Sequence, residues 1–570
     1  MYLSPEERAM GREDFRRAVE GGLSRRDFVK GGIAAGVVSG GSLGAFYFGY
    51  EASVENPVRV AVLGTGDEGS VLIGAINPDY VQVQAIADIR PYNQHRAFHG
   101  DHSSESALKH RPGLMAKYDW RTEDEARKHV RVYGDYQELL QEEKGVEAVI
   151  IALPLHLHAP AAIAAMEAGL HVLTEKLMGH SVHECKEMAR VADRTRRHLA
   201  TGHQRHYNIL YADAMDSIKR GVLGDLHYIR AQWHRGNLPG SDSWQQPMPR
   251  DVKPGDPLAA NLIKTRDSWR RKLAEARGRE IDVWRKRVAQ IEAQIEDVVL
   301  KDTAAGYGYE GKQYKDAQGK VVWDRPPAEE LIRWRLWDRT GGGLMAELGS
   351  HQLDAASIFI SAMHDGVKQH PLKVAAVSNR PIFAHDREAD DHVCCMFEFP
   401  APGYDPKDPE GQRKKIGVQY ASINGNGFGG YGEIVFGTKA TLILQREQEA
   451  LLYRGPGASK VTAGKSGGAT MDTTDTAAAQ TAETKGPVEV SRGYTEQIEH
   501  WAWCIRRNPK LSDPDVRPKC HPQVALGDAV IALTTNLAAQ KGEVIQFKPE
   551  WFDPSSDETP EGVKPSVPVA

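Results

Sequence analysis

Residues 58–88, VRVAVLGTGDEGSVLIGAINPDYVQVQAIAD, decide the fold of this chain. The apolar run 58–63 is long enough for one buried strand and stops at a glycine-rich turn. A helix-compatible segment, 70–76, follows the turn, and a second apolar strand ends on Asp88. Strand, turn, helix and strand in this order predict a parallel, doubly wound α/β sheet of the Rossmann type.

The turn, Gly64-Thr65-Gly66-Asp67-Glu68-Gly69, has the spacing GxGxxG. The first glycine permits the tight turn, the second lets the backbone approach a pyrophosphate, and the third allows close packing of helix on strand. Free N–H groups at the helix start would face the phosphates. We therefore predict that this turn binds a dinucleotide; a glycine-rich turn in another kind of α/β protein is the alternative.

Two residues at the end of the second strand bear on the choice of cofactor. A carboxylate at the position of Asp88 accepts hydrogen bonds from the hydroxyls of an adenosine ribose, which favours NAD. Arg90 is near enough to bind the 2′-phosphate of NADP, so NADP stays possible. Both side chains are predicted to contact the cofactor.

Composition indicates an ordinary globular protein of two or more domains, with 570 residues, 41% hydrophobic and 26% charged. The formal net charge of −5 and the lack of a basic stripe argue against nucleic acid as a partner. The five cysteines show no CxxC spacing, so we expect neither a disulfide framework nor a bound metal.

The N-terminal segment predicts export. Ser24-Arg25-Arg26-Asp27-Phe28-Val29-Lys30 resembles a twin-arginine signal, and an uncharged Gly/Ala-rich run, 31–50, follows it. We expect a periplasmic protein that engages the export machinery, anchored in the membrane if the run stays uncut, and we exclude residues 1–50 from the fold. Because this pathway moves folded proteins, the cofactor would have to be loaded before export and tightly held.

A second α/β unit follows in the sequence. The apolar run 146–153 predicts a buried strand, Pro154 ends it, a helix covers 161–168, and another strand spans 170–174. Glu175-Lys176 then stands at the carboxyl end of that strand, where open α/β sheets bind ligands.

Three motifs together resemble the Gfo/Idh/MocA oxidoreductases, the family of glucose–fructose oxidoreductase and inositol dehydrogenase: the GxGxxG, the pair Pro154 and His158, and the ending AGLHVLTEK. The resemblance implies that these residues and Glu175 line the cofactor site and that Lys176 sits beside the nicotinamide and the substrate hydroxyl. The family usually has Glu-Lys-Pro here, whereas this chain has Leu177 in place of the proline.

The second family landmark lies within residues 341–354, GGGLMAELGSHQLD. On a helix Glu347 and His351 are four residues apart and share a face, and Asp354 follows three residues later. The resemblance implies that His351 is the acid/base on the substrate hydroxyl, with Lys176 orienting the oxygen. The family commonly has Asp where this chain has Glu347. Glu347 either forms a hydrogen bond to the substrate or is a carboxylate on the helix face without a role in the site.

Residues 201–208 are similar to the family's pocket-lining stretch. We predict substrate contacts from His203, Arg205, His206 and Tyr207, and from Asp354; an ordinary surface loop is the alternative.

The predicted domains are a signal at 1–50, a NAD(P)-binding Rossmann domain at 57–202, and a substrate and oligomerisation domain at 203–550 with an open, mainly antiparallel sheet. The last contains an insertion at 238–334 and a mobile loop at 455–486, and a Pro-rich tail fills 551–570. We expect the insertion to pack on its own domain, with a lid or subunit contact as the alternative, and we expect a homo-oligomer, dimer or tetramer.

The predicted function is oxidation or reduction of a secondary hydroxyl or carbonyl of a sugar, cyclitol or glycoside, with retained NAD. A histidine with a reference pKa near 6.5 suits removal of the hydroxyl proton as hydride leaves. One alternative is a glycosidase or lyase that uses transient oxidation on the same fold. The other is a sugar or nucleotide sensor without catalysis.

Overall fold

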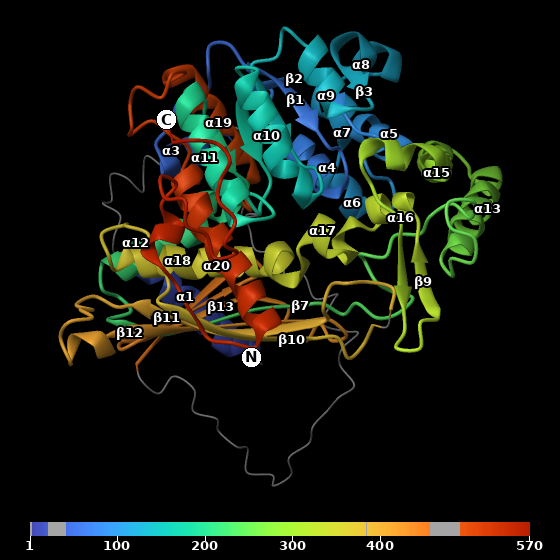
Figure 1. Ribbon diagram of the computed structural model, residues 1–570. Helices are drawn as coiled ribbons and strands as arrows, with labels where there is room; N and C mark the ends of the chain where they lie inside the picture. Colours follow the sequence, from blue (N-terminus) through green and yellow to red (C-terminus); the bar gives the residue numbers. More distant parts are fainter. Residues whose placement is uncertain (1–2, 21–40, 384, 456–490, 570) are drawn as a thin grey trace.

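A computed structural model describes residues 3–20, 41–383, 385–455 and 491–569 (Figure 1). The twin-arginine-like motif and the predicted mobile loop at 456–486 lie outside these residues. Among the described residues, no helix is both long enough and apolar enough to cross a membrane.

The first domain is built on a six-stranded sheet in the order β3-β2-β1-β4-β5-β6. All its pairings are parallel, and β1, β4 and β5 are almost wholly buried, which explains their continuous apolar sequences. The order reverses between β1 and β4, as in the Rossmann fold. Its strands are β1 (Val58–Leu63), β2 (Val81–Ala87), β3 (Arg131–Tyr133), β4 (Ala148–Ile151), β5 (His171–Thr174) and β6 (Leu199–Thr201).

Helices cover both faces of this sheet (Figure 1). They are α4 (Asp67–Ala75), α5 (Pro91–His99), α6 (Glu105–His110), α7 (Gly113–Lys117), α8 (Glu123–His129), α9 (Tyr136–Glu142), α10 (His158–Glu167), α11 (Val182–Thr195) and α19 (Tyr494–Arg507). Helix α19 returns from the end of the chain and contributes the buried side chains Ile498 and Trp501 to the core under β1 and β2.

The second domain has an eight-stranded sheet in the order β15-β14-β13-β7-β12-β11-β10-β16. Only β12 and β7 pair in parallel, so the sheet is mainly antiparallel, as predicted. Its strands are β7 (Leu226–His234), β10 (Lys373–Asn379), β11 (His392–Pro400), β12 (Lys415–Ile423), β13 (Tyr431–Gly437), β14 (Ala440–Gln445), β15 (Glu449–Arg454) and β16 (Ile545–Gln546).

Helices α12 (Ile209–Lys219), α18 (Ser350–Ala362) and α20 (Pro522–Lys541) lie between this sheet and the first domain (Figure 1). Every residue of α18 is buried, and α20 is buried along most of its length. These two buried helices, whose polar side chains such as Asp354 and Asp528 are buried with them, form part of the core between the domains.

The insertion forms α13 (Ala259–Glu275), α14 (Glu280–Glu296), α15 (Leu300–Thr303), a hairpin of β8 (Lys312–Lys315) and β9 (Val321–Arg325), and α16 (Pro327–Ile332). The prediction that it packs on its own domain is confirmed for the hairpin, whose Tyr314 bonds Glu388 and stacks on Trp337, and was wrong for α14, which packs against α5 of the Rossmann domain.

The N-terminal segment also differs from expectation, because its described helices pack on the folded domains. Helix α1 (Pro5–Glu20) lies on β15, where Phe15 is buried and Arg8 forms a 2.6 Å ion pair with Glu449. Helix α3 (Gly41–Phe48) packs on α19. Excluding residues 1–50 from the fold was therefore wrong for the described parts of that segment.

Candidate active site

A cavity of about 790 Å³ lies at the carboxyl edge of the parallel sheet, where the strand order reverses. The loops after β1, β2, β4 and β5 form one side of the cavity, and the second domain with its insertion forms the other. Twelve of the predicted cofactor and catalytic positions line it, namely Gly64, Gly66, Asp67, Glu68, Asp88, Arg90, Pro154, His158, Glu175, Lys176, Glu347 and His351.

The glycine turn is shaped by backbone contacts. Gly64 has φ +86°, and a Cβ there would lie 2.5 Å from the carbonyl oxygen of Ala152, while a Cβ on Gly69 would lie 2.1 Å from the Gly64 oxygen. A Cβ on Gly66 would meet only Asn93 Nδ2, at 3.6 Å. The outer two glycines are therefore required for packing, and Gly66 leaves the approach to the helix start open.

A hydrogen bond joins the backbone of Thr65, in this turn, to the side chain of Asp88. The Thr65 N–H donates to Asp88 Oδ2 at 2.8 Å, and the Arg90 N–H donates to Asp88 Oδ1 at 2.9 Å. Thr65 and Gly69 do not line the cavity, and their contact with the cofactor stays a prediction. Asp88 does line it, with a carboxylate that the backbone holds in place.

These residues fit a dinucleotide. The open face of Gly66 at the start of α4 suits a pyrophosphate, and Asp88 at the end of β2 suits ribose hydroxyls. The carbonyls of Leu153 and Leu177 lie 2.9 and 2.8 Å from the two ring nitrogens of His158, which tie the loop after β4 to the loop that carries Lys176.

Lys176 and Glu347 bring the two domains together in the cavity wall. Lys176 Nζ donates to the Glu347 carbonyl oxygen at 2.7 Å and lies 3.7 Å from the Glu347 carboxylate. Arg335 Nε donates to the same carboxylate at 2.9 Å. Burial alone would raise the pKa of Glu347, but Lys176, Arg335 and Arg235 lower it to about 2. Glu347 is thus an ionised carboxylate that holds cations at the cavity.

His351 lies deeper on the same wall. Its ring is 5.6 Å from the Trp233 ring, and its Nδ1 is buried without a hydrogen-bond partner among the described residues. Burial, reinforced by the cations of Lys176 and Arg205, holds the pKa of His351 well below its usual value. The imidazole is therefore neutral at physiological pH, the state in which it can accept a proton.

The segment that carries these groups departs from the regular helix that the sequence predicts. Residues Met345–Gly349 form a π-helical turn, and α18 begins at Ser350. Such turns widen a helix locally and are frequent at functional sites. Glu347 lies in the turn and His351 in the first turn of α18.

None of the five predicted substrate residues lines the cavity. Tyr207 lies in the core, where its hydroxyl bonds His500 Nδ1 at 2.8 Å. Arg205 is fully buried, pairs with Glu433 and Glu447, and donates to the His351 carbonyl oxygen at 2.8 Å. Arg205 thus lies beneath His351, and the substrate contacts of these five residues stay predictions.

His203, His206 and Asp354 form a buried cluster behind His351. His206 Nε2 lies 2.8 Å from Asp354 Oδ1, and His203 Nδ1 lies 3.7 Å from Asp354 Oδ2. His203, Cys520 and Asp528 also place possible metal ligands within 4.8 Å of one another. The ammonium of Lys368, 2.6 Å from Asp528, already compensates these carboxylates. We therefore assign the cluster to support of α18 rather than to a metal.

Sequence reasoning missed the cavity residues that come from outside the family motifs. They are aromatic and cationic, and they include Trp233, Arg235, Trp334, Arg335, Tyr431, Arg492 and Tyr494. A tryptophan on a strand of the second sheet, such as Trp233, or an arginine far along the chain has no local signal of its own. Arg335 could have been noticed, since it lies just before the glycine run that opens the second landmark.

Comparison with known proteins agrees with this geometry. Residues 58–203 match the family model GFO_IDH_MocA, described as an oxidoreductase family with a NAD-binding Rossmann fold. An uncharacterized oxidoreductase of Rhizobium meliloti is 35% identical over 108 residues, 19% of this chain and 32% of that protein. The α-N-acetylgalactosaminidase of Shewanella oneidensis is 27% identical over 217 residues, 38% of this chain and 43% of that protein.

The matched segments thus span less than half the length of these curated relatives. Over the whole chain, the inositol dehydrogenase homolog of Azotobacter vinelandii, solved with NAD+, has a TM-score of 0.50 at 13% identity and covers 87% of this chain and 98% of its own. That likeness concerns the fold. Residues 58–203 are therefore similar to the NAD-binding Rossmann domain of the GFO_IDH_MocA oxidoreductases, and over most of its length the chain has the same fold as the inositol dehydrogenase homolog.

Proposed function

We propose that the protein is a NAD-dependent oxidoreductase acting on a secondary hydroxyl or carbonyl of a sugar, cyclitol or glycoside. The observation that carries the proposal is the meeting of Lys176 from the Rossmann domain with Glu347 and His351 from the second domain, in the wall of the cavity that also contains Asp88 and the glycine turn. The non-catalytic alternative would leave this convergence of a cation, a carboxylate and a neutral histidine unexplained.

Each residue has a chemical role in this proposal. His351, neutral at physiological pH, takes the proton of the substrate hydroxyl. Lys176 stabilises negative charge on that oxygen, and Glu347 with Arg335 holds the ammonium at the cavity. A bound nicotinamide supplies the hydride acceptor or donor. The paired aromatic rings of Trp233 and Tyr431, 4.3 Å apart, offer an apolar face to a sugar ring.

The first test is the nucleotide content of purified protein. Denaturation should release NAD or NADH near one per chain, and incubation with a panel of sugars and cyclitols should change the near-ultraviolet absorbance of the bound nicotinamide.

Lys176→Met should keep the nucleotide and lose about 10²–10⁴-fold in turnover. Lys144→Met, at an exposed position, is the matched control. Protein that neither contains nor binds a nucleotide would refute the proposal.

The glycosidase alternative has a specific observation in its favour, the similarity of part of the chain to the α-N-acetylgalactosaminidase. In that reaction, transient oxidation at one sugar carbon acidifies its neighbour, the glycosidic bond breaks by elimination, water adds across the resulting double bond, and the carbonyl is reduced again. Aryl-glycosides distinguish the two reactions. Release of the aryl group with no net change in NADH would favour the glycosidase, and net reduction of NAD would favour the oxidoreductase.

Export by the twin-arginine route is a further part of the proposal, supported by the sequence of residues 24–30. A cofactor retained through a closed redox cycle suits a compartment without a NAD pool. We propose a periplasmic location and a homo-oligomer, dimer or tetramer. Replacing Arg25 and Arg26 by lysine should keep the protein in the cytoplasm, and light scattering would give the oligomeric mass.

A further inference from the structure

Arg90 is held by a residue of the insertion. Its Nε and Nη2 donate to Asp297 Oδ2 at 3.0 and 2.8 Å, and the two side chains are 6% and 1% exposed. The Tyr92 N–H donates to the other oxygen of Asp297 at 3.1 Å. Asp297 follows α14 directly, so the ion pair joins the insertion to the first turn after β2.

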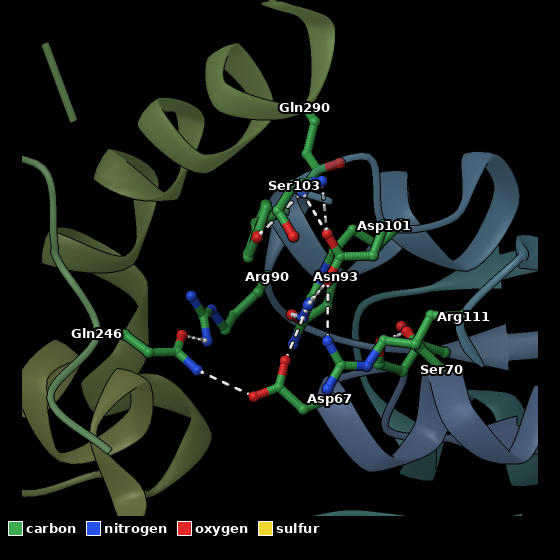
Figure 2. Close-up of polar contacts among 12 residues, drawn as sticks. Asp67, Ser70, Arg90, Asn93, Asp101, Ser103, Arg111, Gln246 and Gln290 are labelled. Carbon is green, nitrogen blue, oxygen red and sulfur yellow. Dashed lines mark hydrogen bonds and ion pairs between the residues drawn. The ribbon is translucent and has the colours of Figure 1, made fainter. Parts of the chain in front are cut away.

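Gln246, which precedes the helices of the insertion, also contacts the guanidinium of Arg90. Gln246 Oε1 accepts from Arg90 Nη1 at 3.3 Å, and Gln246 Nε2 donates to Asp67 Oδ2 at 3.3 Å (Figure 2). On α14, Gln290 Nε2 donates to Asp101 Oδ1 at 2.9 Å, and Figure 2 shows it above the Arg90 and Asn93 side chains. The insertion thus bonds the Rossmann domain through buried polar groups around one edge of the cavity.

The position of Arg90 gives this ion pair its importance. Arg90 lines the cavity two residues after Asp88, where the adenosine ribose of a dinucleotide would lie. A free guanidinium there would bind a 2′-phosphate through paired hydrogen bonds, as arginines commonly do. Asp297 instead occupies the Nε and Nη2 donors, and a phosphate would have to displace a buried carboxylate to reach them.

We propose that Asp297 is a specificity residue that withholds Arg90 from a 2′-phosphate and so makes the site selective for NAD over NADP. The proposal rests on the proposed function and deepens it. A chain with Arg90 but without Asp297 would accept the 2′-phosphate, whereas in this chain the carboxylates of Asp88 and Asp297 both disfavour it. The insertion thereby takes part in choosing the cofactor.

The experiment measures which nucleotide the full-length protein holds. Wild type and Asp297→Asn are produced in the same host, whose cells supply both nucleotides, purified without added nucleotide and denatured, and the released NAD and NADP are quantified by mass. The ratio of NADP to NAD should rise at least about tenfold in Asp297→Asn, since Arg90 is then free to bind phosphate. Asp302→Asn, at an exposed position of the same insertion, should give the wild-type ratio.

The double variant Arg90→Gln/Asp297→Asn removes both charges together. It should return the ratio to that of wild type, because the gain in NADP depends on Arg90. If Asp297→Asn does not fold, the double variant still tests the proposal: a selective loss of NADP relative to wild type would mean that Arg90 already serves the phosphate, and would overturn it. An unchanged ratio in folded Asp297→Asn would also overturn it. Wild type that holds neither nucleotide would instead refute the proposed function.

Discussion

Glu175, which lines the cavity, is an acid whose ionisation the fold perturbs strongly. Burial raises the pKa of Glu175 to about 8, and the carboxylate of Glu68 adds to the shift. Its Oε1 is buried without a hydrogen-bond partner among the described residues. Glu175 is therefore protonated and neutral at physiological pH, next to the ammonium of Lys176.

Replacing Glu175 by glutamine should stabilise the protein at alkaline pH. Because the folded protein keeps the Glu175 proton up to about pH 8 and the unfolded chain loses it near pH 4.5, wild-type stability falls as pH rises between these values. The variant lacks this loss, and its advantage should grow by at most about 1.4 kcal/mol per pH unit. Urea unfolding at pH 5 and pH 8 measures it; a constant difference would contradict the assignment, and Glu138→Gln, at an exposed position, is the control.

For single residues, the sequence predicted the positions that line the cavity better than the ion pairs that these residues form there. Lys176, Glu347 and His351 meet where the motifs indicate. The pairing of Glu347 with Arg335 and of Arg90 with Asp297 joins residues that only the tertiary fold brings together. His203 and Tyr207 lie outside the cavity lining, and the sequence could not show this because a polar residue after a strand has the same pattern in a pocket and in a buried network.

At the scale of elements, the glycine turn between β1 and α4 allows its structural and binding roles to be separated. Gly69→Ala should destabilise the protein by several kcal/mol or prevent folding, since its Cβ would overlap the Gly64 oxygen at 2.1 Å. Gly66→Ala should fold normally and bind NAD at least about tenfold more weakly, since its Cβ would stand where the pyrophosphate approaches.

Thermal unfolding without and with added NAD would measure both effects. Gly66→Ala should match wild type before NAD is added and gain less from it. Equal NAD stabilisation of Gly66→Ala and wild type would show that the turn does not bind the pyrophosphate. A stable Gly69→Ala would show that the close packing at this turn can relax.

Elements with strong periodicity were predicted nearly to the residue. The strand at 58–63 has the expected limits, and the strand predicted at 170–174 begins one residue later and ends at the expected residue. Short strands such as β3 and β6, of three residues each, were missed because they are too short to show a period. The docking of α14 on α5 was missed because it depends on polar partners distant in sequence.

For the whole molecule, the C-terminal segment is part of the folded surface rather than a loose end. Lys186 Nζ donates to the carbonyl oxygens of Glu550, Ser556 and Glu558 at 2.7 to 2.9 Å. Arg190 donates to the carbonyl of Val567 at 2.7 Å. The Pro-rich composition of residues 551–570 suggested a tail. The hydrogen bonds donated by the buried cations of α11, Lys186 and Arg190, show that this segment is held on the folded protein.

Buried histidines determine how the stability of the whole molecule changes in acid. Burial lowers the pKa of eight of them to about 3 or 4: His95, His156, His158, His171, His203, His370, His500 and His521. Burial acts in the opposite sense on carboxyls, raising the pKa of Glu175, Asp213, Glu433 and Glu499 to about 7 or 8. The histidines outnumber these carboxyls.

We therefore predict that the protein loses stability as pH falls from about 6.5 towards about 4. The unfolded chain protonates its histidines near pH 6.5 while the folded protein keeps them neutral, so the unfolded state binds more protons and is favoured. Urea unfolding midpoints between pH 7 and pH 5, at one NAD concentration, should decline. His171→Gln, whose amide oxygen can still accept the His198 N–H, should reduce the slope by about 1.4 kcal/mol per pH unit. His129→Gln, at an exposed position, should leave the slope unchanged, and a flat wild-type profile would contradict neutral burial of these rings.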